Sequence, residues 1–263
     1  MENYFSLLFF TFTCQAAVGV ILVHTILSGT GSLSRIEDSM VRMRHLITVM
    51  LIFSLATAFF HLGKPYRAVY AFNNIMKSPL SMEIASLSVL LAVSLADSWL
   101  SFRSAKNILT SALPVISVIA AIILLLTMTA VYMLPSVPAW YNAGTPLAFV
   151  LTTVSAGTAI VAIIMKSGEM KQASLLLAVA SAAVMILAIS SLIGKMGGDT
   201  GRAVLTGLQA VTALMAFVFV FSRFFLKEMN KSHHMTVITG VLVLISGIIA
   251  RWLFFLSYDN NIL

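Results

Sequence analysis

Residues 107–165 read NILTSALPVISVIAAIILLLTMTAVYMLPSVPAWYNAGTPLAFVLTTVSAGTAIVAIIM, without a single charged side chain. The middle of this run, LPSVPAWYNAGTP at 134–146, holds three prolines and a glycine, which are typical of a turn. The apolar residues on either side reach the roughly 20 that a membrane-spanning helix needs. The run therefore predicts two spanning helices joined by an ordered turn.

The rest of the chain is equally apolar. Of its 263 residues, 60% are hydrophobic and 10% are charged, whereas about a quarter of the residues in a soluble domain are charged. Eight segments are long and apolar enough to cross a bilayer. They are residues 5–28, 45–63, 82–100, 114–134, 146–165, 173–193, 203–225 and 235–256. We expect an all-α integral membrane protein, a bundle of about eight transmembrane helices that forms one polytopic domain over 1–263.

The basic residues predict the orientation of the bundle. With the N-terminus outside, the inner connections carry ten of the 16 lysines and arginines, and the outer side carries the other six. Because inner loops are enriched in basic residues, both termini are expected outside (N-out/C-out). In a membrane protein the net charge of +7 points to topology and anionic lipid, and no nucleic-acid partner is expected.

The sequence holds no motif for a redox centre of its own. Cys14 is the single cysteine, whereas an iron–sulfur cluster needs about four thiolates. A bis-histidine haem needs two facing ligands at one depth. His24 and His61 lie near opposite faces, and only a His24–His45 pair is conceivable. We therefore expect neither haem nor iron–sulfur cluster in this chain, and a buried structural role for Cys14.

A pair of ionisable residues stands at the predicted outer ends of the second and third spans. His61 precedes Gly63 and Pro65, which stop the second span, and Glu83 follows Pro79, which starts the third. Consecutive spans pack side by side, so the two side chains can face one cavity. Oxidation of a quinol needs acceptors for two protons, and histidine and a partly buried carboxylate are suitable groups.

Several other residues have more than one interpretation. Lys64 and Arg67 could steady developing negative charge, or they could snorkel to the interface. Trp140 and Tyr141 could wall a quinone site, contact a partner or belong to an aromatic belt. His61 and Glu83 themselves could be interfacial or helix-capping residues. Two further expectations are an interfacial pairing of Asp97 with Arg103 or Lys106, and a snorkelling Arg251 within an aromatic belt.

Two segments resemble the membrane anchor subunit family of bacterial dimethyl sulfoxide reductase. HLGKPYRAVYAFNN (61–74) with SPLSMEIAS (78–86) resembles that family's segment between its second and third helices, and VPAWYNAGTPLAF (137–149) resembles its connection between the fourth and fifth. The resemblance implies a haem-free anchor in the bacterial inner (cytoplasmic) membrane that oxidises quinol, with menaquinol expected, on its outer side. Its histidine, proline, arginine and glutamate fall on His61, Pro65, Arg67 and Glu83.

The resemblance also implies partners. These are an iron–sulfur electron-transfer subunit and a molybdopterin catalytic subunit, which would perform the terminal reaction. Two other functions remain open, a secondary transporter and a structural anchor without quinol chemistry. Transporters often carry charged sites at the bilayer midplane, whereas the charges here lie at the ends of the spans.

Overall fold

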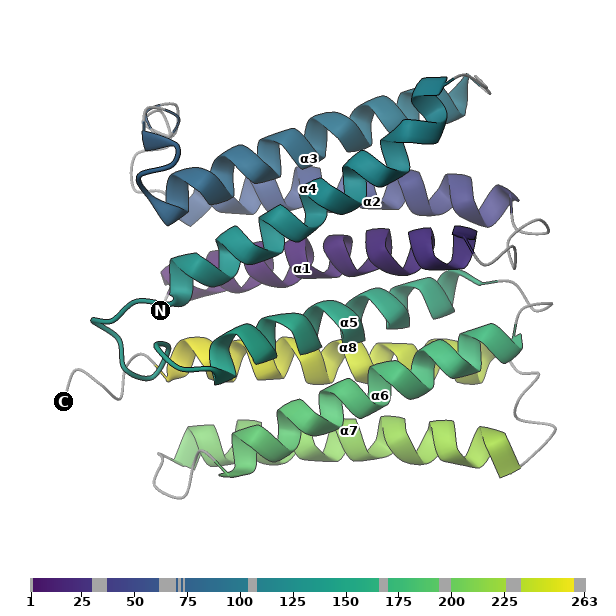
Figure 1. The fold of residues 1–263 in the computed structure, drawn as a ribbon. Coiled ribbons are helices and arrows are strands. Elements are labelled where there is room, and N and C mark those ends of the chain that lie inside the picture. Colours follow the sequence, from purple (N-terminus) through teal and green to yellow (C-terminus); the bar gives the residue numbers. More distant parts are fainter. Residues whose placement is uncertain are drawn as a thin grey trace. The chain divides into compact units, whose positions relative to one another are not determined.

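The computed structural model is almost entirely helical where it describes the chain. The described residues are 2–29, 37–61, 70, 72, 74–103, 108–165, 170–193, 200–225 and 233–257. They form eight helices (Figure 1): α1 (Glu2–Gly29), α2 (Glu37–His61), α3 (Pro79–Phe102), α4 (Ile108–Tyr132), α5 (Gly144–Ile164), α6 (Met170–Ile193), α7 (Thr200–Phe225) and α8 (His233–Leu256). All eight are long and apolar enough to cross a membrane, and the described residues include no strand. The predicted eight-helix, all-α membrane fold is confirmed, while its orientation stays a prediction.

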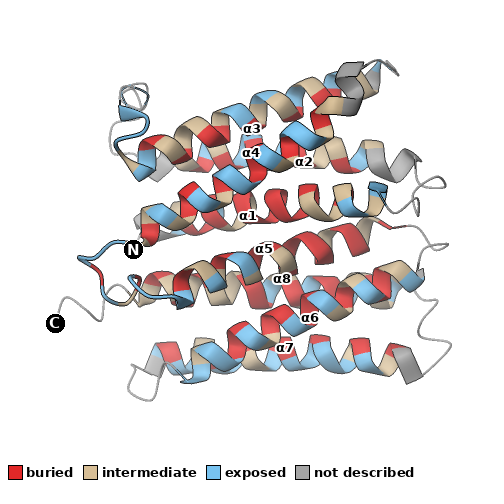
Figure 2. Ribbon diagram, viewed as in Figure 1, coloured by how far each residue is buried: buried red, intermediate tan, exposed pale blue. Residues whose placement is uncertain are grey.

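Each helix has a lipid-compatible face and a packed face. On α4, Val115, Ile119 and Leu126 are exposed, whereas Leu124 and Met128 are fully buried. Buried and exposed residues share each helix in this way along the chain (Figure 2). Large apolar side chains can stay exposed on the outside because lipid, and not water, is the solvent there.

The chain divides into two compact units, Met1–Pro146 (unit 1) and Leu147–Leu263 (unit 2), and the single polytopic domain expected from sequence stays a prediction. In unit 1, helix contacts join α1 to α2, α2 to α3, α3 to α4 and α4 back to α1. These four helices alternate in direction (Figure 1). We call the end where α1 and α3 begin the glutamate end, after Glu83, and the opposite end the aspartate end, after Asp97.

Unit 2 is held together by small residues. In it α6, α7 and α8 contact one another. A cluster of buried residues from these helices and from α5 is mostly alanine, namely Ala159, Ala180, Val184, Ala188, Ala213, Ala216 and Val243. A Cβ added to Gly240 of α8 would lie 2.6 Å from Cγ1 of Ile163 on α5. Small residues of this kind let helix backbones approach closely in lipid.

The connection between α4 and α5 is the ordered turn that the sequence predicts. The amides of Val137 and Trp140 donate to the carbonyls of Leu134 and Val137, each at 2.9 Å. The side chain of Asn142 accepts the amide hydrogen of Gly144 at 2.8 Å, as an N-cap residue does. This turn begins α5 and also fixes the position of Trp140.

Candidate functional site

A cavity of about 200 Å³ lies at the glutamate end of unit 1. All four helices of the unit and the turn after α4 supply its walls, through Leu7, Phe10, Ala58, Leu80, Glu83, Ile84, Val131, Tyr132, Leu134 and Trp140. Glu83 is the one acidic side chain among these lining residues, all of which the structure describes. The cavity is therefore an apolar space with a single carboxylate in its wall.

Glu83 is buried, which is unusual for a carboxylate. Its side chain stands in the second turn of α3, after Pro79 at the helix start, and the residue is only 2% exposed. Its Oε1 atom is buried and has no hydrogen-bond partner within the protein. A buried polar atom without a partner costs about 1–3 kcal/mol, and more when it is charged. A ligand hydroxyl in the adjoining cavity would remove that cost.

Two aromatic rings in contact form part of the cavity wall. Tyr132 and Trp140 meet edge to face with ring centroids 5.5 Å apart, a favourable geometry for aromatic pairs. The hydroxyl of Thr145 donates to the carbonyl of Trp140 at 2.6 Å and so ties this residue to the start of α5. Tyr141, the other aromatic candidate, is 54% exposed and does not line the cavity.

The remaining predicted site residues are described only in part or not at all. His61 is the last residue of α2, one helical turn after the cavity-lining Ala58, and its side chain lies outside the described residues. Lys64 and Arg67 also lie outside them. The structure thus brings Glu83 and Trp140 together and leaves the association of His61, Lys64 and Arg67 with this cavity as a prediction.

The second buried carboxylate of α3 has a different partner from the one expected. Asp97 forms an ion pair with Arg44 of α2, with Oδ1 and Nη1 3.3 Å apart, whereas Arg103 stacks over Trp99 at 4.7 Å. Lys106 lies outside the described residues. The expectation of an Asp97–Arg103 pair was wrong because helix packing, and not closeness along the chain, supplies the partner.

Arg251 also differs from its expected role. The residue is only 1% exposed, and its guanidinium lies 4.1 Å from the ring centre of Phe149 and 5.3 Å from that of Phe254. It donates to the hydroxyl of Thr152 at 3.3 Å. Arg251 therefore joins α8 to α5 within unit 2 and does not snorkel to the interface.

The buried role expected for Cys14 is confirmed, since this residue is fully buried in α1.

The geometry of the glutamate end suits an aromatic ligand with a hydroxyl at its edge. An engineered apolar cavity of about 150 Å³ holds a benzene molecule, so about 200 Å³ is enough for a substituted ring. The Glu83 carboxylate can accept a hydrogen bond or a proton from that hydroxyl. Phe10 and Tyr132 were missed from sequence because an apolar position in a span carries no signal that separates cavity lining from ordinary packing.

Comparisons with known proteins agree with the resemblance seen in the two segments. The protein-family model described as "DMSO reductase anchor subunit (DmsC)" matches residues 1–257. The sequence is 31% identical over 169 residues to the YnfH subunit of the anaerobic dimethyl sulfoxide reductase of Escherichia coli, covering 62% of this protein and 58% of that one. It is 29% identical over 153 residues to the C subunit of the anaerobic dimethyl sulfoxide reductase of Haemophilus influenzae, covering 57% and 54%.

A third relative matches over a longer stretch. The C subunit of the anaerobic dimethyl sulfoxide reductase of Escherichia coli is 26% identical over 214 residues, which cover 80% of this protein and 74% of that one. The first two matches span little more than half of those relatives' length.

Proposed function

The chain belongs to the DMSO reductase anchor subunit family, and from that premise we propose that it oxidises quinol at the glutamate-end cavity for a dimethyl sulfoxide reductase-type molybdoenzyme. As a member of this family with eight apolar helices, it is a multi-pass membrane protein. The observation that carries the quinol proposal is the buried Oε1 of Glu83, which lacks a partner beside an apolar cavity. Menaquinol in the bacterial inner membrane is the expected substrate.

The proposed oxidation of quinol needs two proton acceptors, and both candidates belong to helices that meet at the glutamate end of unit 1. Oxidation of a quinol releases two protons and two electrons. Glu83 accepts the proton of one hydroxyl and His61 accepts that of the other, while Trp140 and Tyr132 hold the ring. Lys64 and Arg67 are proposed to stabilise negative charge that develops as the first proton leaves.

The two electrons must leave the chain, because no redox motif is present in its sequence. We propose that they pass to an iron–sulfur cluster of an electron-transfer partner and then to a molybdopterin catalytic partner. The partner would dock at the glutamate end, which would face outward. Four large side chains are exposed in the connection before α3, namely Tyr70, Phe72, Ile75 and Met76. Basic Lys77 beside them is exposed too, so an acidic, partly apolar partner surface would fit there.

The experiment that tests this proposal compares two carboxylates on one helix face. Glu83 and Asp97 are fourteen residues apart on α3, about 21 Å along its axis, and both are buried. Glu83→Gln removes the proton acceptor at the cavity, and Asp97→Asn removes the other carboxylate with the same small change of shape. Quinol-driven and dye-driven turnover are measured on the same membranes, per assembled complex.

We expect Glu83→Gln, and likewise His61→Ala, to lower quinol-driven turnover by about 10²–10⁴-fold, the usual contribution of a positioned base. Dye-driven turnover, which bypasses the anchor, should persist. Asp97→Asn should keep quinol turnover per complex. Wild-type quinol turnover in Glu83→Gln would contradict the proposal and favour a structural anchor without quinol chemistry.

A further inference from the structure

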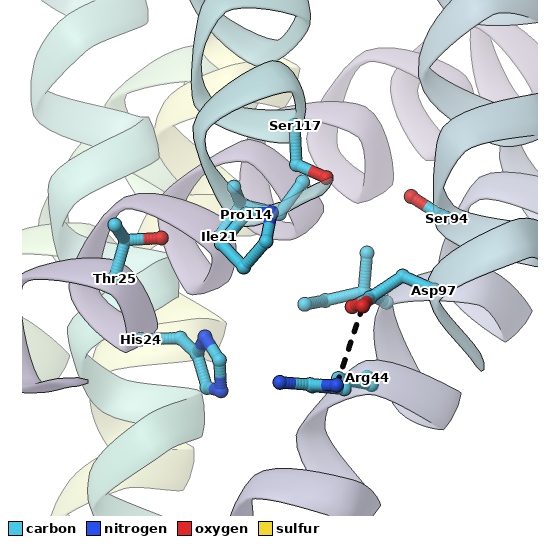
Figure 3. Close-up of a pocket in the computed structure, with 9 residues that line it drawn as sticks. Ile21, His24, Thr25, Arg44, Ser94, Asp97, Pro114 and Ser117 are labelled. Atoms are coloured by element: carbon cyan, nitrogen blue, oxygen red, sulfur yellow. Dashed lines mark ion pairs between the residues drawn. The ribbon is translucent and has the colours of Figure 1, made fainter. Parts of the chain in front are cut away.

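A layer of polar side chains crosses unit 1 at its aspartate end, on the far side from the Glu83 cavity. Each helix contributes to it: α1 gives His24, α2 gives Arg44, α3 gives Asp97 and α4 gives Ser117 (Figure 3). These side chains converge on a cavity of about 20 Å³. In the close-up the His24 ring faces the Arg44 guanidinium, and Asp97 lies beside it.

Three atoms of this layer are buried without a hydrogen-bond partner within the protein. They are Nε2 of His24, Nε of Arg44 and Oδ1 of Asp97, and of the three only Oδ1 of Asp97 has an ionic contact, with Nη1 of Arg44 at 3.3 Å. His24 is 7% exposed and Asp97 is 9% exposed, whereas the side chain of Arg44 is 22% exposed, so bulk solvent reaches the edge of the layer at Arg44 more readily than it reaches His24 or Asp97. Buried polar groups in folded proteins are almost always satisfied by the protein or by ordered water. Two atoms without any partner and a carboxylate oxygen with room for a further hydrogen bond, all around one cavity, indicate that something outside the chain completes the layer.

We infer that the aspartate end binds one ordered water molecule that bridges His24, Asp97 and Arg44. A cavity of at least about 10–15 Å³ with two to four polar partners can hold a water, and this cavity meets both conditions. The water would donate to Oδ1 of Asp97 and to Nε2 of His24 in its Nδ1-protonated tautomer. It would accept the Nε hydrogen of Arg44.

Other small occupants fit the layer less well. A metal cation would lie against the guanidinium of Arg44, and a halide or phosphate would lie against the carboxylate of Asp97, since the two groups are 3.3 Å apart. The volume also excludes a quinol ring. A neutral molecule that both donates and accepts, of the size of one water, complements the charges and the space.

The bridge would connect helices that already share direct polar contacts. Thr48 of α2 and Ser98 of α3 are hydrogen-bonded at 2.7 Å, and the hydroxyl of Thr48 also reaches the carbonyl of Ser94 at 3.1 Å. These contacts join α2 to α3 only. The bridging water would add α1, through His24, to the same network. This inference does not depend on quinol chemistry at the other end of the unit.

Hydroxyl-radical labelling by X-ray radiolysis in ¹⁸O-water tests the inference on the full chain in lipid nanodiscs. Radicals form from water, so a buried side chain is labelled only where a water lies next to it. Ile21 lines the cavity and is 4% exposed, and Leu90 of α3 is fully buried away from it. We expect several-fold more labelling at Ile21 than at Leu90.

Two variants separate a bound water from leakage of solvent. His24→Leu removes one partner and fills the space, so labelling at Ile21 should fall several-fold towards that of Leu90. Asp97→Asn keeps an acceptor oxygen and should retain the labelling. Equal labelling of Ile21 and Leu90 in the wild-type chain would overturn the inference, even if His24→Leu failed to fold. Unchanged labelling at Ile21 in a folded His24→Leu variant would overturn it as well.

Discussion

Unit 1 and unit 2 each take four helices of the chain, yet they bury opposite kinds of side chain. Unit 1 buries two carboxylates, Glu83 and Asp97, each beside a cavity. The described residues of unit 2 include no acidic residue and bury three arginines. Arg223 donates to the hydroxyl of Thr236 at 2.8 Å, and Arg202 donates to the carbonyl of Leu256.

Under the proposed function, this difference separates a unit that takes part in the reaction from a unit that only packs. A carboxylate beside an apolar cavity can take up a proton from a ligand, whereas an arginine stays protonated and serves hydrogen bonding and stacking. Changes in unit 2 should therefore alter stability, and changes at the glutamate end of unit 1 should alter quinol turnover.

The largest effect on stability is expected at Arg251 in unit 2. Arg251→Ala leaves a cavity between α5 and α8 and removes the contacts to Phe149 and Thr152, so we expect a loss of about 3 kcal/mol in unfolding free energy. Arg251→Leu is the matched control, because an apolar side chain that fills a buried charged site is often neutral. Thermal unfolding in nanodiscs measures both. An equal loss in the two variants would show that the guanidinium itself, and not packing, holds α5 to α8.

A smaller loss is expected at Gly240, where α8 approaches α5 closely. Gly240→Ala places a methyl group 2.6 Å from a side-chain carbon of Ile163, and overpacking of this kind costs about 2 kcal/mol. A second change, Ile163→Val, shortens the opposing side chain and should recover part of the loss. The same unfolding assay reports the result, and quinol turnover per assembled complex should stay at the wild-type level. A fall in quinol turnover per assembled complex in Gly240→Ala would contradict the division into a unit for quinol chemistry and a unit for packing.

The aromatic wall of unit 1 should affect quinol binding. Trp140→Ala removes the ring that meets Tyr132 edge to face, and we expect the quinol KM to rise about tenfold, since aromatic contacts of this kind contribute about 1.4 kcal/mol. Tyr141→Ala, at the exposed neighbour, is the control and should leave KM unchanged. A higher KM in Tyr141→Ala, with an unchanged KM in Trp140→Ala, would indicate that quinol binds at the outer surface of the turn.

The smallest effect on stability is expected at a pair of hydroxyl groups, which belong to Ser86, three residues after Glu83 on α3, and to Thr127 on α4. Ser86 and Thr127 are hydrogen-bonded at 2.9 Å between α3 and α4. Ser86→Ala should lower the unfolding free energy by about 1 kcal/mol, the net contribution of one such bond, because Thr127 also bonds the carbonyl of Leu124 and keeps a partner. A fall of quinol turnover as large as that of Glu83→Gln would mean that Ser86 takes part in proton transfer.

Much of the fold and one part of the site could be predicted from sequence. The eight helices follow from hydropathy, because a segment in lipid must satisfy its backbone internally. Glu83 stood out because an ionisable residue within a span is costly. The contact between Asp97 and Arg44 and the burial of Arg251 could not be predicted in the same way. Both depend on which faces of different helices meet, and the order of residues along one helix does not show that.

Photolabelling with an azidoquinone tests the central claim, that quinol binds at the glutamate end of unit 1, most directly. The analogue is added to membranes with the assembled complex, activated by light, and the labelled peptides are mapped with and without excess unlabelled quinol. We expect label on residues that line the cavity, such as Phe10, Ile84 and Tyr132, and loss of that label when quinol competes. Competable label on the helices of unit 2, or at the aspartate end around His24, would contradict it.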